Sequence, residues 1–542
     1  MPNHYLLTER NVPIMLVVLW LLLVVAGLWL RPLLPIDETR YVSVAWEMWS
    51  RGDFLVPYIN GEPYSHKPPL LFWIYHLGWL VTGVSEWWVR VAAPLFSLGS
   101  LFLVRHIAHL LWPKQQAAGY YAPLIVLGSV FWTAYTGAAM FDMLLTFFML
   151  LGVIGIIRAT QGARSGFVIT GVAIGLGILA KGPVILLLVL PTMLLMPLWR
   201  VAGEGPSLGR WYLGVLSSFL LGALIALAWA VPAGMAGGEV YRDAIFWGQS
   251  AGRMVKSFAH ERAWWWYLPV LPVLLFPWSY WPALWRELPR LSLKDTGTRL
   301  CVTWFIVTFV IFSAVSSKQL HYMLPLFPAA ALLAANLLAR SNKPVSAVSQ
   351  SIPAILLIGL IVLLLALPNS GKSLPFWFAD GRWTVLLLAV VPAAMLLFVR
   401  TLKTAVAMLT ITSVTLVIIM LIALQPVFNK VASLDAVSQI IARAQIEQKP
   451  VAHLLKYNNQ YHFPGRLSEP LVILSEQALP DWVAAHPDGL VISYHENCYG
   501  SPKGPIYTQY YLDRRLFVWQ SAYLREQPND YVLTVCGEPV GS

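Results

Sequence analysis

Long apolar runs are the feature that most constrains this chain. They recur from Val12 to Leu424, many of them 18 or more residues long, and a helix needs about that length to cross a bilayer core of roughly 30 Å. Only 12% of the residues are charged, about half the share typical of soluble domains. The sequence therefore predicts a polytopic α-helical membrane protein. The first run, Val12 to Leu30, carries too little charge in front of it for a cleaved signal, so we expect an uncleaved first span.

Hydropathy predicts about thirteen spans within a transmembrane domain of residues 1–424. They are expected near residues 12–31, 86–111, 118–135, 141–159, 166–181, 183–199, 211–233, 264–285, 299–316, 319–339, 351–368, 382–399 and 404–424. Two outer loops, 31–85 and 232–263, are too long to be turns. Residues 70–80 form an aromatic-rich run too short to span, so we expect juxtamembrane helices lying in the membrane interface.

Positive charge is concentrated in one set of alternate loops and span ends. That set holds fifteen Lys and Arg against four Asp and Glu, which equals the formal net charge of +11 of the whole chain. Loops rich in Lys and Arg stay in the cytoplasm, so the N-terminus is expected inside and the C-terminal domain outside. The basic balance is thus a signal of topology, and no nucleic-acid partner is expected.

The residues from 425 to 542 differ in kind and predict a small soluble α/β domain. Ser433 is expected to cap a helix whose apolar positions have helical spacing, namely Leu434, Val437, Ile441 and Ala444. Short β-type runs follow at 451–455, 471–474, 490–494 and 531–535. Cys301 falls in a predicted span as an inert apolar residue. Whether Cys498 and Cys536 pair in an oxidising compartment stays open.

Ionisable side chains gather at the outer ends of the predicted spans. They are Asp37, Glu38, Lys67, Asp142, Lys181, Arg253, His260 and Lys318, with Tyr322 close to the last. Ionisable residues at membrane depth are costly and are candidates for function. Cations suit a phosphate, and a carboxylate suits a hydroxyl or a developing sugar cation. All of them fall on the outer side of the expected topology, so carboxylates and cations that suit these tasks are expected to converge at one membrane surface.

Most of these residues also have a structural interpretation. Lys181 and Lys318 are placed to extend towards lipid headgroups, and Asp142 is placed to cap a helix. His66 and His260 are more typical of hydrogen-bonded structural histidines than of metal ligands, because no second ligand follows at helical spacing. The adjacent acids at positions 37 and 38 are harder to explain structurally, since they repel each other.

Several motifs follow one another in a recognisable order. They are Asp-Glu-Thr-Arg-Tyr at 37–41, Gly-Asp-Phe-Leu-Val-Pro at 52–57, Lys-Pro-Pro at 67–69, Asp142, Ala-Lys-Gly at 180–182 and Phe-Ala-His…Trp-Tyr-Leu-Pro at 258–269. Over about residues 10–340 the chain resembles the bacterial branch of the protein O-mannosyltransferase superfamily. It is most similar there to the lipid A 4-amino-4-deoxy-L-arabinose transferases (ArnT).

The resemblance implies an inverting GT-C glycosyltransferase of the bacterial inner membrane. Such an enzyme takes a sugar from a polyprenyl (undecaprenyl) monophosphate donor and passes it to a periplasmic acceptor. The acceptor that the resemblance favours is lipid A. The implied catalytic carboxylates are Asp37, Glu38 and Asp142. The implied donor phosphate-binding cations are Lys67, Arg253, Arg40 and Lys181, and the substrate pocket holds Tyr41, Tyr322, Lys318 and His260. We expect Asp37 to orient the acceptor and, for a hydroxyl, to take its proton.

Two departures from the aminoarabinose enzymes leave the sugar and any divalent metal open. His66 precedes Lys67 where those enzymes have an acid, and Tyr322 lies in Gln-Leu-His-Tyr-Met-Leu-Pro instead of Leu-Pro-Thr-Tyr. A protein or another envelope glycan is the alternative acceptor. A lipid flippase or transporter is the alternative class, but transporters place polar groups near the midplane and show paired halves. Membrane lipids are expected partners, and no other cofactor is expected.

Overall fold

The chain forms two compact units in a computed structural model. The structure describes residues 11–201, 203, 205–247, 261–341, 343–366, 390–496, 504–512 and 514–528. Among these, the first unit holds residues 11–28, 65–366 and 390–422, and the second holds residues 29–64 and those from 423 onwards. The expected first outer loop, 31–85, therefore divides between the two units after Tyr64.

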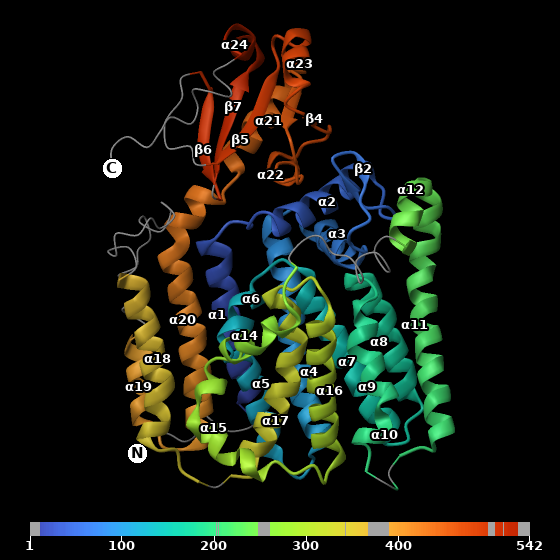
Figure 1. Ribbon diagram of the computed structural model, residues 1–542, viewed down its shortest axis with the longest axis vertical. Coiled ribbons are helices and arrows are strands. Elements are labelled where there is room, and N and C mark those ends of the chain that lie inside the picture. The colour runs from blue at the N-terminus through green and yellow to red at the C-terminus, as the bar shows by residue number, and fades with distance from the viewer. Residues whose placement is uncertain are drawn as a thin grey trace. The chain divides into compact units, whose positions relative to one another are not determined.

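The first unit is built of helices (Figure 1). They are α1 (Val12–Leu30), α3 (Leu70–Thr82), α4 (Glu86–Leu111), α5 (Gln116–Leu127), α6 (Val130–Thr136), α7 (Phe141–Thr160), α8 (Ser165–Lys181), α9 (Val184–Leu194), α10 (Met196–Trp199), α11 (Leu208–Ala236), α12 (Gly238–Asp243), α14 (Tyr267–Leu274), α15 (Pro282–Glu287), α16 (Thr296–Ala314), α17 (Phe327–Ala339), α18 (Ala347–Ala366), α19 (Val390–Met395) and α20 (Leu402–Val431). Within the described ranges, seven helices are long and apolar enough to cross a membrane, or eight if α5 and α6, bent by 68°, form one span. The prediction of a multi-pass α-helical membrane protein is confirmed, whereas the count of thirteen spans is not.

Small residues set the spacing of the central helices. Helix α7 packs against α4 and α8, and α8 packs in turn against α11 (Figure 1). A Cβ atom added to Gly155 of α7 would lie 2.6 Å from the carbonyl oxygen of Gly166 on α8, closer than a real contact allows. Small residues at a crossing point let two helix backbones approach closely. This crossing fixes the positions of α7 and α8, which carry two of the candidate site residues at their ends.

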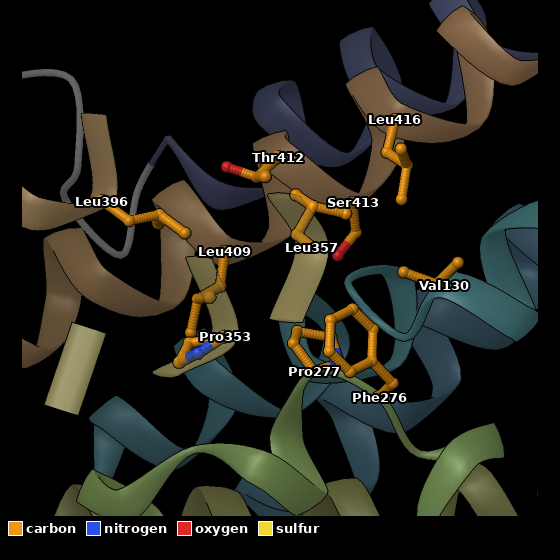
Figure 2. A pocket seen from close by; sticks show the side chains of 10 residues that line it. All are labelled: Val130, Phe276, Pro277, Pro353, Leu357, Leu396, Leu409, Thr412, Ser413 and Leu416. Atoms are coloured by element: carbon orange, nitrogen blue, oxygen red, sulfur yellow. The ribbon is translucent and has the colours of Figure 1, made fainter. Parts of the chain in front are cut away.

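The segment expected as one span at 264–285 is instead a series of short helices. The 3-10 turns Trp264–Trp266 and Trp278–Tyr280 alternate with α14 and α15. Proline interrupts a helix because it lacks a donor and clashes with the preceding turn, and Pro272 and Pro277 fall in this segment. A void of about 10 Å³ lies beside the break. Figure 2 shows Phe276 and Pro277 on one side of it and the Ser413 hydroxyl pointing in from α20.

The second unit contains a five-stranded mixed sheet with strand order β4-β3-β5-β7-β6. Its strands are β3 (Val451–Leu454), β4 (Val472–Leu474), β5 (Leu490–Glu496), β6 (Tyr507–Tyr511) and β7 (Arg514–Gln520), and its helices are α21 (Asp435–Ile446), α22 (His462–Gly465), α23 (Leu479–Ala485) and α24 (Ser521–Glu526). Strand β3 pairs in parallel with β4 and β5, while β7 pairs antiparallel with β5 and β6. Alternate residues of β5 and β7 join two separate apolar clusters, one with α21 and the other with α23 and α24. The prediction of a small α/β domain is confirmed.

The details of this domain agree only in part with the sequence-based expectations. The four expected apolar positions are buried, but Leu434, the first of them, is itself the residue that caps α21. The prediction of Ser433 as the cap is therefore wrong. Three expected strands match β3, β4 and β5 within two residues, while β6 and β7 were missed. The run at 531–535 and the cysteines at 498 and 536 lie outside the described residues. Cys301 is buried in α16, as expected.

The second unit also includes the first part of the outer loop. Helix α2 (Asp37–Arg51) is followed by a short hairpin of β1 (Tyr58–Ile59) and β2 (Glu62–Pro63) with an Asn60-Gly61 turn. Both turn residues have positive φ, the conformation that this residue pair favours in hairpins. The Asn60 side chain exchanges two hydrogen bonds with the backbone of Leu471, at 2.8 and 3.0 Å. This part of the loop is thereby fixed to the C-terminal domain.

A buried carboxylate completes this attachment. Glu47 of α2 accepts hydrogen bonds from the backbone N–H groups of Asn60 (2.6 Å) and Gly61 (3.0 Å) and from Asn459 Nδ2 (2.7 Å). Trp46 Nε1 donates to the Leu467 carbonyl at 2.8 Å. Because the Glu47 carboxylate is buried, these donors stabilise its charge. Helix α2 therefore has a fixed orientation on the domain.

Candidate active site

The first group of candidate residues surrounds Asp142, in the first turn of α7. Its carboxylate is buried, with 3% of the side chain exposed, and forms an ion pair with Lys181 in the last turn of α8. Nε2 of His321 lies 4.0 Å from Asp142 Oδ1. An acid at a helix N-terminus and a base at a helix C-terminus both interact favourably with the helix dipoles. The close packing of α7 and α8 thus holds an oppositely charged pair at matching ends.

Aromatic rings line the same group. Nζ of Lys181 lies 5.0 Å from the centre of the Tyr322 ring, within the range of a cation–π interaction. His321 stacks on Tyr135 with ring centres 5.4 Å apart and meets Tyr322 edge-on at 4.8 Å. Sequence reasoning missed His321 and Tyr135. The one signal for His321 was its place in the segment that departs from the aminoarabinose enzymes.

Lys67, in the segment before α3, also lies near this group. Its Nζ lies 5.7 Å from the centre of the Phe141 ring, and Phe141 directly precedes Asp142. The Lys67 ammonium is close enough to act electrostatically on the Asp142 carboxylate. Two ammonium groups beside one carboxylate make the group net positive. Of the candidates, the structure therefore brings together Lys67, Asp142, Lys181 and Tyr322.

Lys318 has different neighbours. Its ammonium is buried and donates hydrogen bonds to the backbone carbonyls of Arg262 (3.1 Å) and Val315. Val315 follows the last residue of α16, where carbonyl groups have no partner within the helix. These contacts show Lys318 closing the end of a helix. Arg253 and His260, also expected at the site, lie outside the described residues.

The second group of candidates lies in the second unit, in the first turn of α2. Asp37 is half-exposed, with 42% of its side chain accessible. Its Oδ1 accepts hydrogen bonds from Arg40 and, at 3.2 Å, from the Tyr41 hydroxyl. The Arg40 guanidinium lies 5.4 Å from the centre of the Tyr41 ring. The Asp37 carboxylate is thus oriented by two neighbours and still accessible.

Glu38 has the opposite environment. Its carboxylate is buried and accepts two hydrogen bonds from Arg31, at 2.6 and 3.0 Å, and one from the Leu34 backbone N–H at 2.7 Å. These bonds fix the turn between α1 and α2. The two adjacent acids therefore do not share one environment, and Asp37 is the accessible one. Within the described ranges, no group of three or more His, Cys, Asp or Glu residues is arranged to hold a metal ion.

Comparisons with known proteins agree with the resemblance that the motifs indicated. Residues 66–234, which include Lys67, Asp142 and Lys181, match the family described as dolichyl-phosphate-mannose-protein mannosyltransferase. The undecaprenyl phosphate-alpha-4-amino-4-deoxy-L-arabinose arabinosyl transferase of Edwardsiella ictaluri is 30% identical over 318 residues, covering 56% of this chain and 55% of that one. The protein of the same description from Pseudomonas aeruginosa (strain UCBPP-PA14) is 29% identical over 355 residues, covering 63% and 61%. The chain thus spans a little over half the length of these curated relatives.

The similarity to solved structures extends over nearly the whole chain. The crystal structure of ArnT from Cupriavidus metallidurans in the apo state superposes with a TM-score of 0.75 at 19% identity, covering 94% of this chain and 98% of that one. The chain shares the fold of ArnT. The ArnT structure bound to undecaprenyl phosphate matches with a TM-score of 0.71 at 20% identity, covering 97% and 99%. The predictions of a GT-C fold and of a resemblance to ArnT are confirmed.

Proposed function

We propose that this protein is a membrane glycosyltransferase that moves 4-amino-4-deoxy-L-arabinose from undecaprenyl monophosphate to lipid A. The observation that carries the proposal is the buried Asp142–Lys181 pair with Lys67 beside it, a net positive group suited to a phosphate. The relatives named as arabinosyl transferases use an undecaprenyl phosphate-linked aminoarabinose by their description. An ArnT of the same fold has been crystallised with undecaprenyl phosphate.

The proposed reaction forms a bond between an acceptor oxygen and the anomeric carbon and breaks the bond from that carbon to the carrier phosphate. Negative charge grows on the phosphate oxygen as this bond breaks. Fixed cations lower the barrier because they need no reorganisation when the charge appears. Lys67 and Lys181 would supply this charge, and Asp142 would hold Lys181 in position. Attack from the face opposite the phosphate would invert the anomeric centre.

Asp37 is the proposed residue for the acceptor. A lipid A phosphate is already an anionic nucleophile, so Asp37 would only orient it. A hydroxyl acceptor must lose a proton, and the accessible Asp37 carboxylate would then receive it. The contacts of Asp37 with Arg40 and Tyr41 support this role, because they hold the carboxylate in one direction.

The matched family favours a second candidate function. Its description names a protein acceptor and a mannosyl donor on a polyprenol-type phosphate. Transfer to a Ser or Thr hydroxyl would use the same cations at the phosphate and would require Asp37 as a base. The two candidates therefore differ in the acceptor, in the sugar and in the need for a base.

We further propose that the protein lies in the bacterial inner membrane with its N-terminus in the cytoplasm and its C-terminal domain in the periplasm. The concentration of the net positive charge on one set of loops supports this orientation. Periplasmic exposure of the sheet domain also suits a lipid-linked donor used outside the cytoplasm.

A transfer assay with the full-length protein in detergent tests the proposal. Undecaprenyl phosphate carrying labelled aminoarabinose is supplied with lipid A or with a Ser/Thr-rich peptide. We expect label on lipid A, at least about tenfold less with Lys67→Ala, and no change with the exposed Lys114→Ala. Label on the peptide alone would favour the second candidate. Movement of the intact donor across a vesicle membrane, without a new bond, would show a transporter and overturn both.

A further inference from the structure

A cavity of about 280 Å³ lies in the first unit, and none of its lining residues belongs to the group around Asp142. Its lining residues come from the end of α5, from the broken segment between α14 and α15 and from α17. Alanines 330, 331 and 334 of α17 form one wall. Small side chains face a segment whose helix is interrupted, so neither wall fills the space between them.

The surface of this cavity is apolar. Its two hydroxyl groups are already used, because Ser129 donates to the Ile125 carbonyl at 2.9 Å and Ser279 donates to the Pro272 carbonyl at 2.5 Å. An apolar cavity of about 150 Å³ stays dry and holds a benzene ring. The present cavity has nearly twice that volume, enough for roughly ten to twelve chain carbons by the same measure. Its chemistry therefore fits a hydrocarbon chain.

Two arginines follow the lining residues of α15 and of the next turn, Leu288–Arg290, in the chain. Leu284 and Trp285 of α15 line the cavity, and Arg286 follows directly. Buried Glu287 binds both Arg286, with Nε and Oε1 3.1 Å apart, and Arg290. The two arginine side chains remain 33% and 44% exposed. Two guanidinium groups on one carboxylate leave a net positive charge, which suits a phosphate.

We propose that this cavity binds one acyl chain of an anionic phospholipid, with the lipid phosphate against Arg286 and Arg290. The inference does not depend on the proposed glycosyl transfer. Both arginines belong to the set of basic loops expected in the cytoplasm, and the cytoplasmic leaflet carries the anionic lipids. The apolar volume, together with two arginines that follow its lining residues in the chain, selects this ligand over an uncharged one.

Native mass spectrometry of the full-length protein tests this site. The probes are phosphatidylglycerol, phosphatidylcholine with the same acyl chains, and undecaprenyl phosphate. We expect retention of one phosphatidylglycerol in preference to phosphatidylcholine. The double variant Arg286→Ala/Arg290→Ala should weaken the phosphatidylglycerol complex by at least about tenfold. Arg210→Ala, an exposed arginine on α11, is the matched control and should bind normally.

Cavity-filling variants test the chain site separately. Ala331→Leu extends a side chain into the cavity and should abolish phosphatidylglycerol binding. If that variant does not fold, Ala334→Leu fills the cavity from a second position and should have the same effect. Equal retention of the two phospholipids would overturn the proposal, as would normal binding in a folded Ala331→Leu variant. One-for-one replacement of phosphatidylglycerol by undecaprenyl phosphate would also overturn it, because the cavity would then hold a prenyl chain.

Discussion

The different environments of the adjacent acids Asp37 and Glu38 make a sharp prediction. Glu38→Gln keeps the shape of the side chain but leaves the buried Arg31 guanidinium without its charged partner. Breaking a buried pair on one side costs about 3–5 kcal/mol. Asp37→Asn removes a half-exposed pair with Arg40, and an exposed pair contributes only about 0–1 kcal/mol. Neighbouring substitutions should therefore differ strongly in their effect on stability.

The order of the two substitutions should be reversed for activity: Asp37→Asn should lower the rate of sugar transfer more than Glu38→Gln does. One kcal/mol shifts the unfolding midpoint of a unit of this size by about 2–4 °C, so Glu38→Gln should lower it by roughly 6–20 °C and Asp37→Asn by less than about 4 °C. Transfer should fall at least about 100-fold in Asp37→Asn, within the range expected for a lost general base. Thermal unfolding in detergent, hydrogen exchange of α2 and the transfer assay measure these quantities on the same preparations.

Glu239→Gln is the control, because its exposed carboxylate also pairs with an arginine three residues on, Arg242 at 3.2 Å. It should change neither stability nor transfer appreciably. A folded Asp37→Asn variant with wild-type transfer would refute the role of Asp37. A Glu38→Gln variant as stable as the wild type would refute the separation of the two acids. A hydroxyl acceptor also predicts a steep pH dependence that disappears in Asp37→Asn, whereas a phosphate acceptor predicts a shallow one.

Three further predictions concern other parts of the molecule. Lys181→Ala leaves Asp142 buried without its partner and should destabilise the protein by about 3–5 kcal/mol; adding Asp142→Ala should restore thermal stability but not transfer. Burial lowers the pKa of His453 to about 4, below the value of about 6.5 in the unfolded chain, so about 3 kcal/mol of stability present above pH 6.5 should be lost as the pH falls towards 4. Unfolding measured across this range should show that loss, and His453→Phe should flatten it. Reporter fusions after Arg290 should report cytoplasm and fusions after Ser542 the periplasm; a cytoplasmic result at Ser542 would show a miscounted span.

The sequence alone determined the membrane-spanning character of the chain and the presence of a C-terminal α/β domain. Helices α1, α4 and α16 start and end within a few residues of the expected spans, because span length and apolar content are local properties. The strands β3 and β5 were found for the same reason, since short β-type runs are visible without their partners. The break near Pro277 was missed, although prolines are visible in the sequence. Proline is tolerated in membrane helices when neighbours satisfy the freed backbone groups, and those neighbours are set by the fold.

Only the tertiary structure decided which polar side chains meet. Motif order named Lys67, Asp142 and Lys181 as candidates, but their approach to one another depends on the packing of α7 against α8. Glu47 and Asn459 are 412 positions apart in the sequence, so no local sequence pattern could predict their hydrogen bond. Adjacent residues 37 and 38 look equivalent in the sequence, yet one is accessible and the other buried, because successive positions on a helix point in directions about 100° apart. Burial and partnership are properties of the folded chain, since they depend on residues that the sequence places far away.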